Sequence, residues 1–422
     1  MRHAPVPAAV QAALLAAALA LPTALPAGAA DALPELPAPA AAAADLGWAA
    51  PGFVLGDPGR GEGIGIEPMP DGGHLLTGYL TREGGGLDIL LLRLGPDGRE
   101  QWRRSFGGAG TDFAFRTRRL ADGGFVLAGF TDSAGAGGTD ALLMRLDPEG
   151  RPLWSRTYGG AQGERAVDVV PLPDGGFVVS GETASEGAGK RDVMLLRTDA
   201  QGETVWRRAY GTANTDRGFS LAAMPDGGFL VMGLRVAEGD DDYARRDALL
   251  LRTDAEGSEL WTRTYGGAGD DVAHAMRALP DGTLLLSGYM ASRGAGGADA
   301  WVMKLDARGG VIWETVWGGP GEERMMAGIP LGDGGVAVVG NSASFGASGP
   351  GDAYLLRLDA AGRVLGQTLL GGPGGDSAYW VEETPDGGLV ATGYAERGGQ
   401  GAAARDLAFF RLPPGWRGDP GK

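Results

Sequence analysis

Short apolar runs and alternating apolar and polar residues recur along most of the chain, separated by turns rich in Gly, Asp and Pro. In residues 165–211, the runs are 165–171, 177–181 and 192–197, and residues 203–210 alternate. Runs of about five to eight residues bounded by such turns predict β-strands. Because no part of this unit has the 3.6-residue apolar period of a helix, we expect four strands and no helix in it.

The unit recurs seven times. An Asp-Gly-Gly turn, or Asp-Gly-Thr in one unit, returns at intervals of 51 to 55 residues, at Asp71, Asp122, Asp174, Asp226, Asp281, Asp333 and Asp386. Four short strands in each of seven units predict an all-β, seven-bladed β-propeller of four-stranded antiparallel blades. A β-solenoid is the alternative, but residues 48–56 match the last strand of a unit and the seventh unit stops after its third strand. We therefore expect residues 48–56 to pair with residues 406–412 and close the ring.

The two ends of the chain differ from the repeat. Arg2 precedes an uncharged apolar run, Ala8–Leu21, and small residues follow before Asp31. This layout predicts a signal peptide over residues 1–30, with an uncleaved interfacial or spanning helix as the alternative. Residues 31–45 read as a Pro/Ala-rich lead-in, 46–412 as the propeller and 413–422 as a tail. The expected location is the periplasm or the cell exterior.

The composition agrees with a fold rich in turns and excludes some classes of binding partner and metal site. There are 78 Gly and 26 Pro, but 43% hydrophobic residues and 10 Trp argue against disorder. A net charge of −16 makes nucleic acid and anionic lipid poor partners. The chain has no Cys and three His, so thiolate chemistry and a multi-His metal cluster are excluded. No second membrane-length segment is present, and a monomer is expected.

Residues that return in every unit are expected to serve the fold. Five Trp at one strand position predict packing between blades: Trp102, Trp154, Trp206, Trp261 and Trp313. An Asp that opens the third strand of every unit, as Asp192 does, is expected to bond local backbone N–H groups. Two segments resemble calcium-binding nonapeptide repeats, starting at Gly107 and Gly266, but they do not recur every nine residues, which disfavours calcium. We predict no metal site and no cofactor.

A second set of acidic residues opens the first strand of six units. They are candidate binding residues: Asp112, Glu164, Asp216, Asp271, Glu323 and Asp376. In a propeller this position surrounds one mouth of the central channel, where six carboxylates would attract cations. Alternatively, each accepts backbone N–H bonds at a blade junction or pairs with a neighbouring Arg.

Exceptions to the repeat are the other candidates for binding. The fourth unit has the longest loop, residues 237–246, which contains Asp241 and Tyr243. Tyr379 and Trp380 in the seventh unit replace smaller or non-aromatic residues of most other units. His274 is expected near the same mouth, as a packed or solvated residue rather than a base. We predict no catalytic residue.

Two resemblances follow from these motifs. The hairpin Leu146–Trp154, with its Asp, Gly and Trp, resembles the tryptophan-docking repeat of quinoprotein-type propellers, although the paired cysteines of quinone dehydrogenases are absent. Residues 48–412 resemble secreted bacterial repeat proteins, through Asp174–Gly181, Asp192–Trp206 and Tyr158-Gly159-Gly160. These resemblances imply export and a propeller, without a general activity.

The sequence therefore favours an exported, non-catalytic binding or scaffold module for a protein or glycan, carried on the loop-bearing face. An enzyme is the alternative, either a polysaccharide hydrolase or lyase or a quinone-type oxidoreductase, since propellers host such chemistries.

Overall fold

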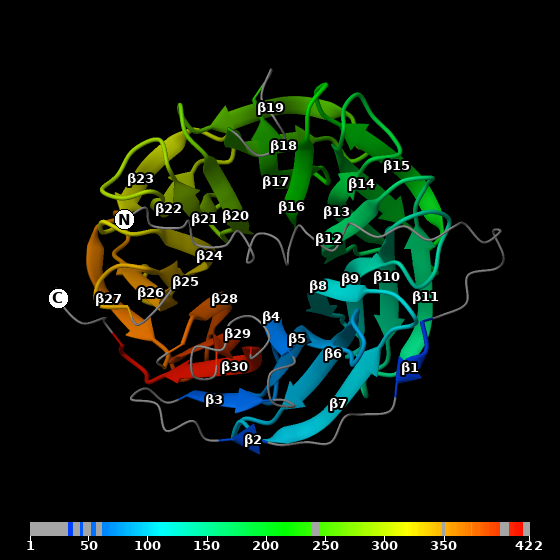
Figure 1. The fold of residues 1–422 in the computed structure, drawn as a ribbon. Helices are drawn as coiled ribbons and strands as arrows, with labels where there is room; N and C mark the ends of the chain where they lie inside the picture. The colour runs from blue at the N-terminus through cyan, green and yellow to red at the C-terminus, as the bar shows by residue number, and fades with distance from the viewer. Residues whose placement is uncertain are drawn as a thin grey trace.

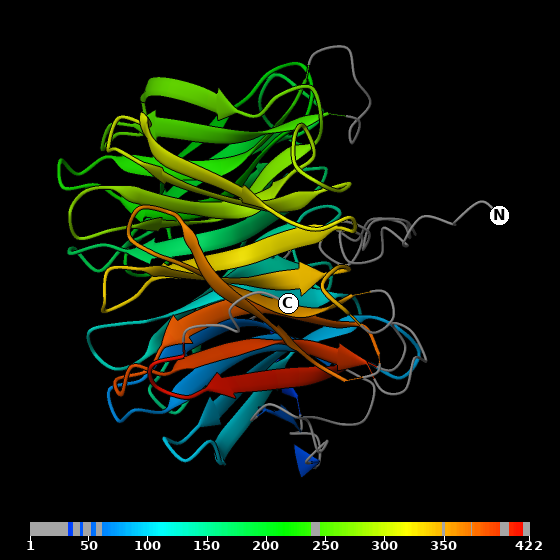
Figure 2. The same ribbon diagram turned by 90° about the vertical axis from the view of Figure 1, so that its left-hand side faces the viewer.

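In the computed structural model, seven β-sheets are arranged as blades around a central channel (Figure 1). The structure describes residues 33–36, 43–44, 52–55, 61–237, 245–347, 351–372, 374–396 and 405–416. Seen edge-on, the ring is a disc whose strands run between its two faces (Figure 2). Every element in the described residues is a strand, and the predicted seven-bladed propeller of four-stranded antiparallel blades is confirmed.

Each blade runs from the channel outward in four strands. The inner strands are β4 (Gly61–Pro68), β8 (Asp112–Arg119), β12 (Glu164–Pro171), β16 (Asp216–Ala223), β20 (Asp271–Ala278), β24 (Glu323–Pro330) and β28 (Asp376–Glu383). The second strands are β5 (His74–Thr81), β9 (Phe125–Thr131), β13 (Phe177–Thr183), β17 (Phe229–Val236), β21 (Leu284–Met290), β25 (Val336–Ser342) and β29 (Leu389–Glu396). The third strands are β6 (Leu87–Leu94), β10 (Asp140–Leu146), β14 (Asp192–Thr198), β18 (Arg246–Thr253), β22 (Asp299–Leu305), β26 (Asp352–Leu358) and β30 (Arg405–Leu412). The outer strands are β7 (Glu100–Phe106), β11 (Pro152–Tyr158), β15 (Thr204–Tyr210), β19 (Glu259–Tyr265), β23 (Val311–Trp317), β27 (Val364–Leu370) and, in the seventh blade, β3 (Gly52–Leu55).

The seventh blade is completed by the beginning of the chain. Strand β3 pairs antiparallel with β30, with Gly52 opposite Phe410 and Leu55 opposite Leu407. The ring closure predicted from the phase of the repeat is thereby confirmed, and within the described residues the closing strand covers 52–55.

Two short strands add to the outer edges of the closing blades. Strand β1 (Glu35–Leu36) pairs with β7 of the first blade, and β2 (Ala43–Ala44) pairs with β3 of the seventh. The Pro/Ala-rich composition of residues 31–45 gave no sign of these strands. They cover part of two sheet edges whose backbone groups would otherwise be unpaired.

The hydrophobic core lies between adjacent blades. All seven residues of β9 and all seven of β13 are buried. Because both faces of a blade pack against neighbouring blades, both alternating sets of side chains in these strands lie away from water. The outer strands are more exposed; in β15 no residue is fully buried.

The Trp of five outer strands packs against the next blade, as the sequence predicts. A Cβ atom at Gly202 would lie 2.9 Å from the Trp154 ring, so only Gly leaves room for it. The hydroxyl of Tyr158 donates to the carbonyl of the same Gly202 at 2.6 Å. The contacts repeat as Trp102–Gly150, Trp154–Gly202, Trp206–Gly257, Trp261–Gly309 and Trp313–Gly362. These five pairs join the first six blades in series.

In the part of the chain that the structure describes, no helix has the length and apolar character to cross a membrane. The predicted signal peptide, residues 1–30, lies outside the described residues.

Candidate functional site

Every inner strand has a one-residue bulge at its fourth position. Pairing between β12 and β13, for example, passes from Ala166 to Asp168 and skips Val167. A bulge adds a residue that has no partner and redirects its side chain. All seven bulge residues line one cavity in the channel and form what we call the bulge ring: Ile64, Phe115, Val167, Phe219, His274, Met326 and Tyr379.

This channel cavity has a volume of about 170 Å³. Its walls come from the first five positions of the inner strands, with additions such as Tyr79 and Leu234 from the second strands. The cavity therefore occupies the half of the channel where the inner strands begin. The ends of the longest loop, Val236 and Arg246, pair with each other at this same face.

Charged side chains interrupt the apolar wall. Four arginines and three carboxylates line the channel cavity: Arg116, Arg165, Arg217, Arg246, Glu62, Asp168 and Glu182. All seven are buried. Burial of charge is costly unless the charges are paired, so the partners of each group decide what the site can bind.

Glu182 is shared by three arginines. Its carboxylate lies 2.9 Å from Arg191, 3.0 Å from Arg217 and 3.7 Å from Arg165. Burial alone would raise the pKa of Glu182, but Arg217, Arg165 and Arg191 outweigh it and lower the pKa. Arg165 and Arg217 follow the candidate acids Glu164 and Asp216 in the sequence, and both form ion pairs with Glu182 of β13.

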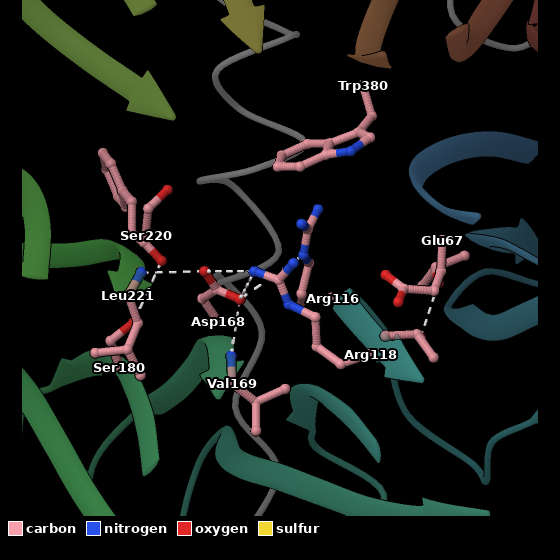
Figure 3. Close-up of polar contacts among 12 residues, drawn as sticks. Glu67, Arg116, Arg118, Asp168, Val169, Ser180, Ser220, Leu221 and Trp380 are labelled. Carbon is pink, nitrogen blue, oxygen red and sulfur yellow. Dashed lines mark hydrogen bonds and ion pairs between the residues drawn. The ribbon is translucent and has the colours of Figure 1, made fainter. Parts of the chain in front are cut away.

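Asp168 lies beside Arg116 in the channel cavity, but its hydrogen bonds come from other groups. It accepts hydrogen bonds from Arg118 at 3.1 Å, from the Val169 N–H at 2.9 Å and from the Leu221 N–H at 3.0 Å. Arg116 approaches no closer than 3.8 Å to the carboxylate (Figure 3). On its other side, the Arg116 guanidinium lies 3.7 Å from the centre of the Trp380 ring, a cation–π contact.

Two further polar groups complete the wall. Glu62 accepts hydrogen bonds from the Tyr379 hydroxyl at 3.0 Å and from Arg405 at 3.1 Å. Arg246 is bound by Asp270 and by the Tyr289 hydroxyl, at 2.6 and 2.8 Å. These groups are therefore held by the protein itself.

His274 is a neutral member of the bulge ring. Burial lowers its pKa to about 4, and its Nδ1 lies 2.9 Å from the Met325 carbonyl, to which it must donate. The other ring nitrogen is then an acceptor at neutral pH. The ring is half-buried in the cavity wall and lies against Tyr289, with 5.4 Å between ring centres.

The six predicted acidic residues open six inner strands, as expected, but their carboxylates do not converge in the channel. Each is buried and accepts the backbone N–H of the residue four positions earlier, at 2.6 to 2.8 Å. None of the six lines the channel cavity: Asp112, Glu164, Asp216, Asp271, Glu323 and Asp376. The arrangement matches the local-bonding alternative.

Of the remaining candidates, Tyr379 and Trp380 both line the channel cavity, whereas Asp241 and Tyr243 lie outside the described residues. Sequence reasoning did not single out Arg116, Asp168 or Glu182. Each of the three differs from the residues at the same strand position in most other blades, and this difference could have pointed to them. Which strand positions face the channel, however, depends on the bulge, and the sequence does not show the bulge. Among residues 33–416 that are described, no group of three or more His, Asp or Glu could hold a metal ion.

Comparisons with known proteins are consistent with the fold and leave the family open. No family model matches the chain. The regulatory protein FlaEY of Caulobacter vibrioides is 31% identical over 178 residues, which cover 39% of this chain and 18% of that protein. The chain therefore spans less than a fifth of that relative's length.

Among solved structures, puromycin hydrolase superposes with a TM-score of 0.51 and 18% identity, covering 86% of this chain and 55% of that one. The WD40 domain of Neurospora crassa Pan2 gives a TM-score of 0.49 and 11% identity, covering 85% and 92%. At 18% identity, the match to puromycin hydrolase shows a shared fold alone. The resemblance to quinoprotein-type propellers stays a prediction.

Proposed function

We propose that the chain is an exported, non-catalytic β-propeller that binds a protein or glycan partner through the channel cavity and the loops around it. The observation that carries this proposal is that the residues facing the channel differ from blade to blade, whereas the packing residues repeat. The packing position of the outer strands is Trp in five units, whereas the fifth position of the inner strands holds Gly65, Arg116, Asp168, Ser220, Ala275, Ala327 and Trp380. A rigid frame that encloses a variable, concave and partly aromatic surface is typical of binding sites.

Ion pairing within the channel cavity favours binding over hydrolysis. Glycoside hydrolysis requires a general acid whose environment favours the protonated form. The three arginines around Glu182 lower its pKa and so favour the ionised form, not the protonated one. Glu62 and Asp168 also have arginine partners, Arg405 and Arg118.

Export is supported by the layout of residues 1–30. We expect the purified protein from its native host to begin at Asp31, because the small residues Ala27, Ala29 and Ala30 precede it. N-terminal sequencing and cell fractionation check this. An intact Met1 terminus on protein recovered from the cytoplasm would contradict it.

Binding is tested with the purified chain on a glycan array and by affinity capture followed by titration of the identified partner. A Val167→Trp variant fills the channel cavity, and a Leu153→Gln variant changes an outer-strand residue that is 60% exposed. We expect Val167→Trp to weaken binding at least tenfold and Leu153→Gln to leave it unchanged. Equal binding by both variants, or chemical conversion of the bound glycan, would contradict the proposal.

A further inference from the structure

Arg116 is a buried cation that makes no hydrogen bond to the described residues. Its side chain is 6% exposed, and within that part of the chain its Nε atom has no hydrogen-bond partner. Among the described residues its polar contacts are the 3.8 Å approach to Asp168 and the stacking on Trp380. Burial lowers its pKa to about 9, so the group is still positive at neutral pH. A buried guanidinium with free donors is costly, and such a cost is retained where a ligand supplies the partner.

The other arginines of the channel cavity do not share this feature. Arg165 and Arg217 are ion-paired with Glu182, and Arg246 is bound by Asp270 and Tyr289. Asp168 does not serve Arg116 in the same way, because Arg118 and two backbone N–H groups already occupy its oxygens. The donors of Arg116 are therefore the ones available to a ligand.

The surrounding residues hold Arg116 in a fixed position. Its guanidinium lies against the Trp380 ring, whose Nε1 donates to Glu382 at 2.8 Å. Glu382 is in turn held by Arg277 at 2.6 Å. Figure 3 shows the planar group between Trp380 and Asp168. A planar, pre-positioned guanidinium matches the two oxygens of a carboxylate, which it can bind with paired hydrogen bonds.

The rest of the channel cavity limits the size and polarity of the group to which a bound carboxylate could be attached. Ile64, Phe115, Val167, Phe219 and Met326 of the bulge ring give it an apolar wall. Its volume of about 170 Å³ is close to that of the engineered apolar cavity of about 150 Å³ that holds one benzene. The space thus suits one ring-sized apolar group.

We propose that the channel cavity binds a carboxylate attached to an apolar group about the size of a benzene ring, with Arg116 receiving the carboxylate. The inference rests on the proposed binding function and names the chemistry of its ligand. A small aromatic acid and the C-terminal residue of a polypeptide share this chemistry. Both carry a carboxylate that could form the paired hydrogen bonds that Asp168, at 3.8 Å, does not form with Arg116.

The test is isothermal titration calorimetry of the purified chain with 3-phenylpropionate and N-acetylphenylalanine, and with 3-phenylpropionamide as the uncharged control. We expect at least one acid to bind and the amide to bind at least tenfold more weakly. Preference for N-acetylphenylalanine assigns a polypeptide C-terminus, and preference for 3-phenylpropionate assigns a small acid. Binding of the amide as tightly as the acids, or of none of the three, would overturn the proposal.

Arg116→Met tests the residue, with Arg151→Met as a matched control because the Arg151 side chain is 60% exposed. We expect Arg116→Met to abolish acid binding while its thermal midpoint stays about equal, because Asp168 keeps Arg118 and two backbone N–H groups as partners. Arg151→Met should change neither. Acid binding that survives in Arg116→Met would sink the assignment. Failure of the acids to bind while an identified partner still binds would leave the proposed function standing without this ligand.

Discussion

Gly202 shows how one residue serves the ring in two ways. Its φ of +79° is a left-handed conformation that other residues adopt with strain, and its missing side chain leaves room for Trp154 of the preceding blade. The sequence placed a Gly at this turn and a Trp in the outer strand, and the structure shows that the two residues touch.

We predict that Gly202→Ala destabilises the protein by about 2–4 kcal/mol, the sum of the left-handed strain and the collision with Trp154. Gly282→Ala is the matched control, because Gly282 has a φ of +80° with open space around it. It should cost only about 1–2 kcal/mol. Urea unfolding of the two variants measures the difference, and equal losses would mean that the Trp contact contributes nothing.

Asp376 carries a pH dependence that the sequence does not reveal. Burial, with Asp352 and Glu396 nearby, raises its pKa to about 7, although the N–H bonds from Gly372 and Glu396 act against this. The folded state therefore holds a proton more tightly than the unfolded state does. Between about pH 4 and pH 7 this group makes the folded state less stable as the pH rises.

We predict that Asp376→Asn, which cannot titrate, flattens the pH profile of stability over this window. The difference between wild type and variant should change by about 2–4 kcal/mol from pH 4 to pH 8. Urea unfolding at four pH values gives the two profiles. Other carboxyl groups with a raised pKa, such as that of Asp112, contribute equally to the wild-type and variant profiles. Parallel profiles would contradict the assignment.

Among the elements, the four-residue strand β3 closes the ring. It supplies the outer strand of the seventh blade and is the point where the two ends of the chain meet. In a closed ring no blade is terminal, whereas a ring without β3 has one three-stranded blade with an exposed edge.

We predict that deletion of residues 31–60, which removes β1, β2 and β3, lowers the thermal midpoint by at least about 5 °C. Deletion of residues 31–50 retains β3 and should have a smaller effect. Scanning calorimetry of both variants checks this, together with their size in solution, since the exposed edge of β30 favours association. Equal midpoints for the two deletions would show that β3 does not close the ring in solution.

For the whole molecule, closure makes the seven blades mutually dependent. Each blade buries its faces against two neighbours, and the hydrophobic clusters extend across blade boundaries, as from Val126 of the second blade to Met194 of the third. Loss of one blade therefore exposes apolar surface on both sides.

We predict that the intact ring unfolds in one cooperative transition, with a calorimetric enthalpy equal to the van't Hoff enthalpy. Removal of β3 should raise the ratio of the calorimetric to the van't Hoff enthalpy above one, because blades at the end of an open array can unfold separately. Several resolved transitions in the intact chain would contradict this picture.

The fold followed from the sequence because its determinants are local and repeated. Asp174-Gly175-Gly176 marks a turn by its residue types alone, and the spacing of such turns gives the number of blades. Trp380 was also found, as an exception among equivalent positions. The channel cavity was not predictable, because the bulge at Val167 is a property of pairing with β13. Arg116 looks like any strand arginine until its burial and its distance from Asp168 are known.

The junction of β3 with β30 also has a consequence for how the protein is made. Strand β3 ends at residue 55 and its partner begins at residue 405, so at about 5–20 residues per second the partner follows roughly 20 to 70 seconds later. Until then one strand near the beginning of the polypeptide lacks its partner. A product that ends between residues 396 and 405 contains all seven inner strands and still cannot close. Synthesis of β30 thus decides whether the ring can close.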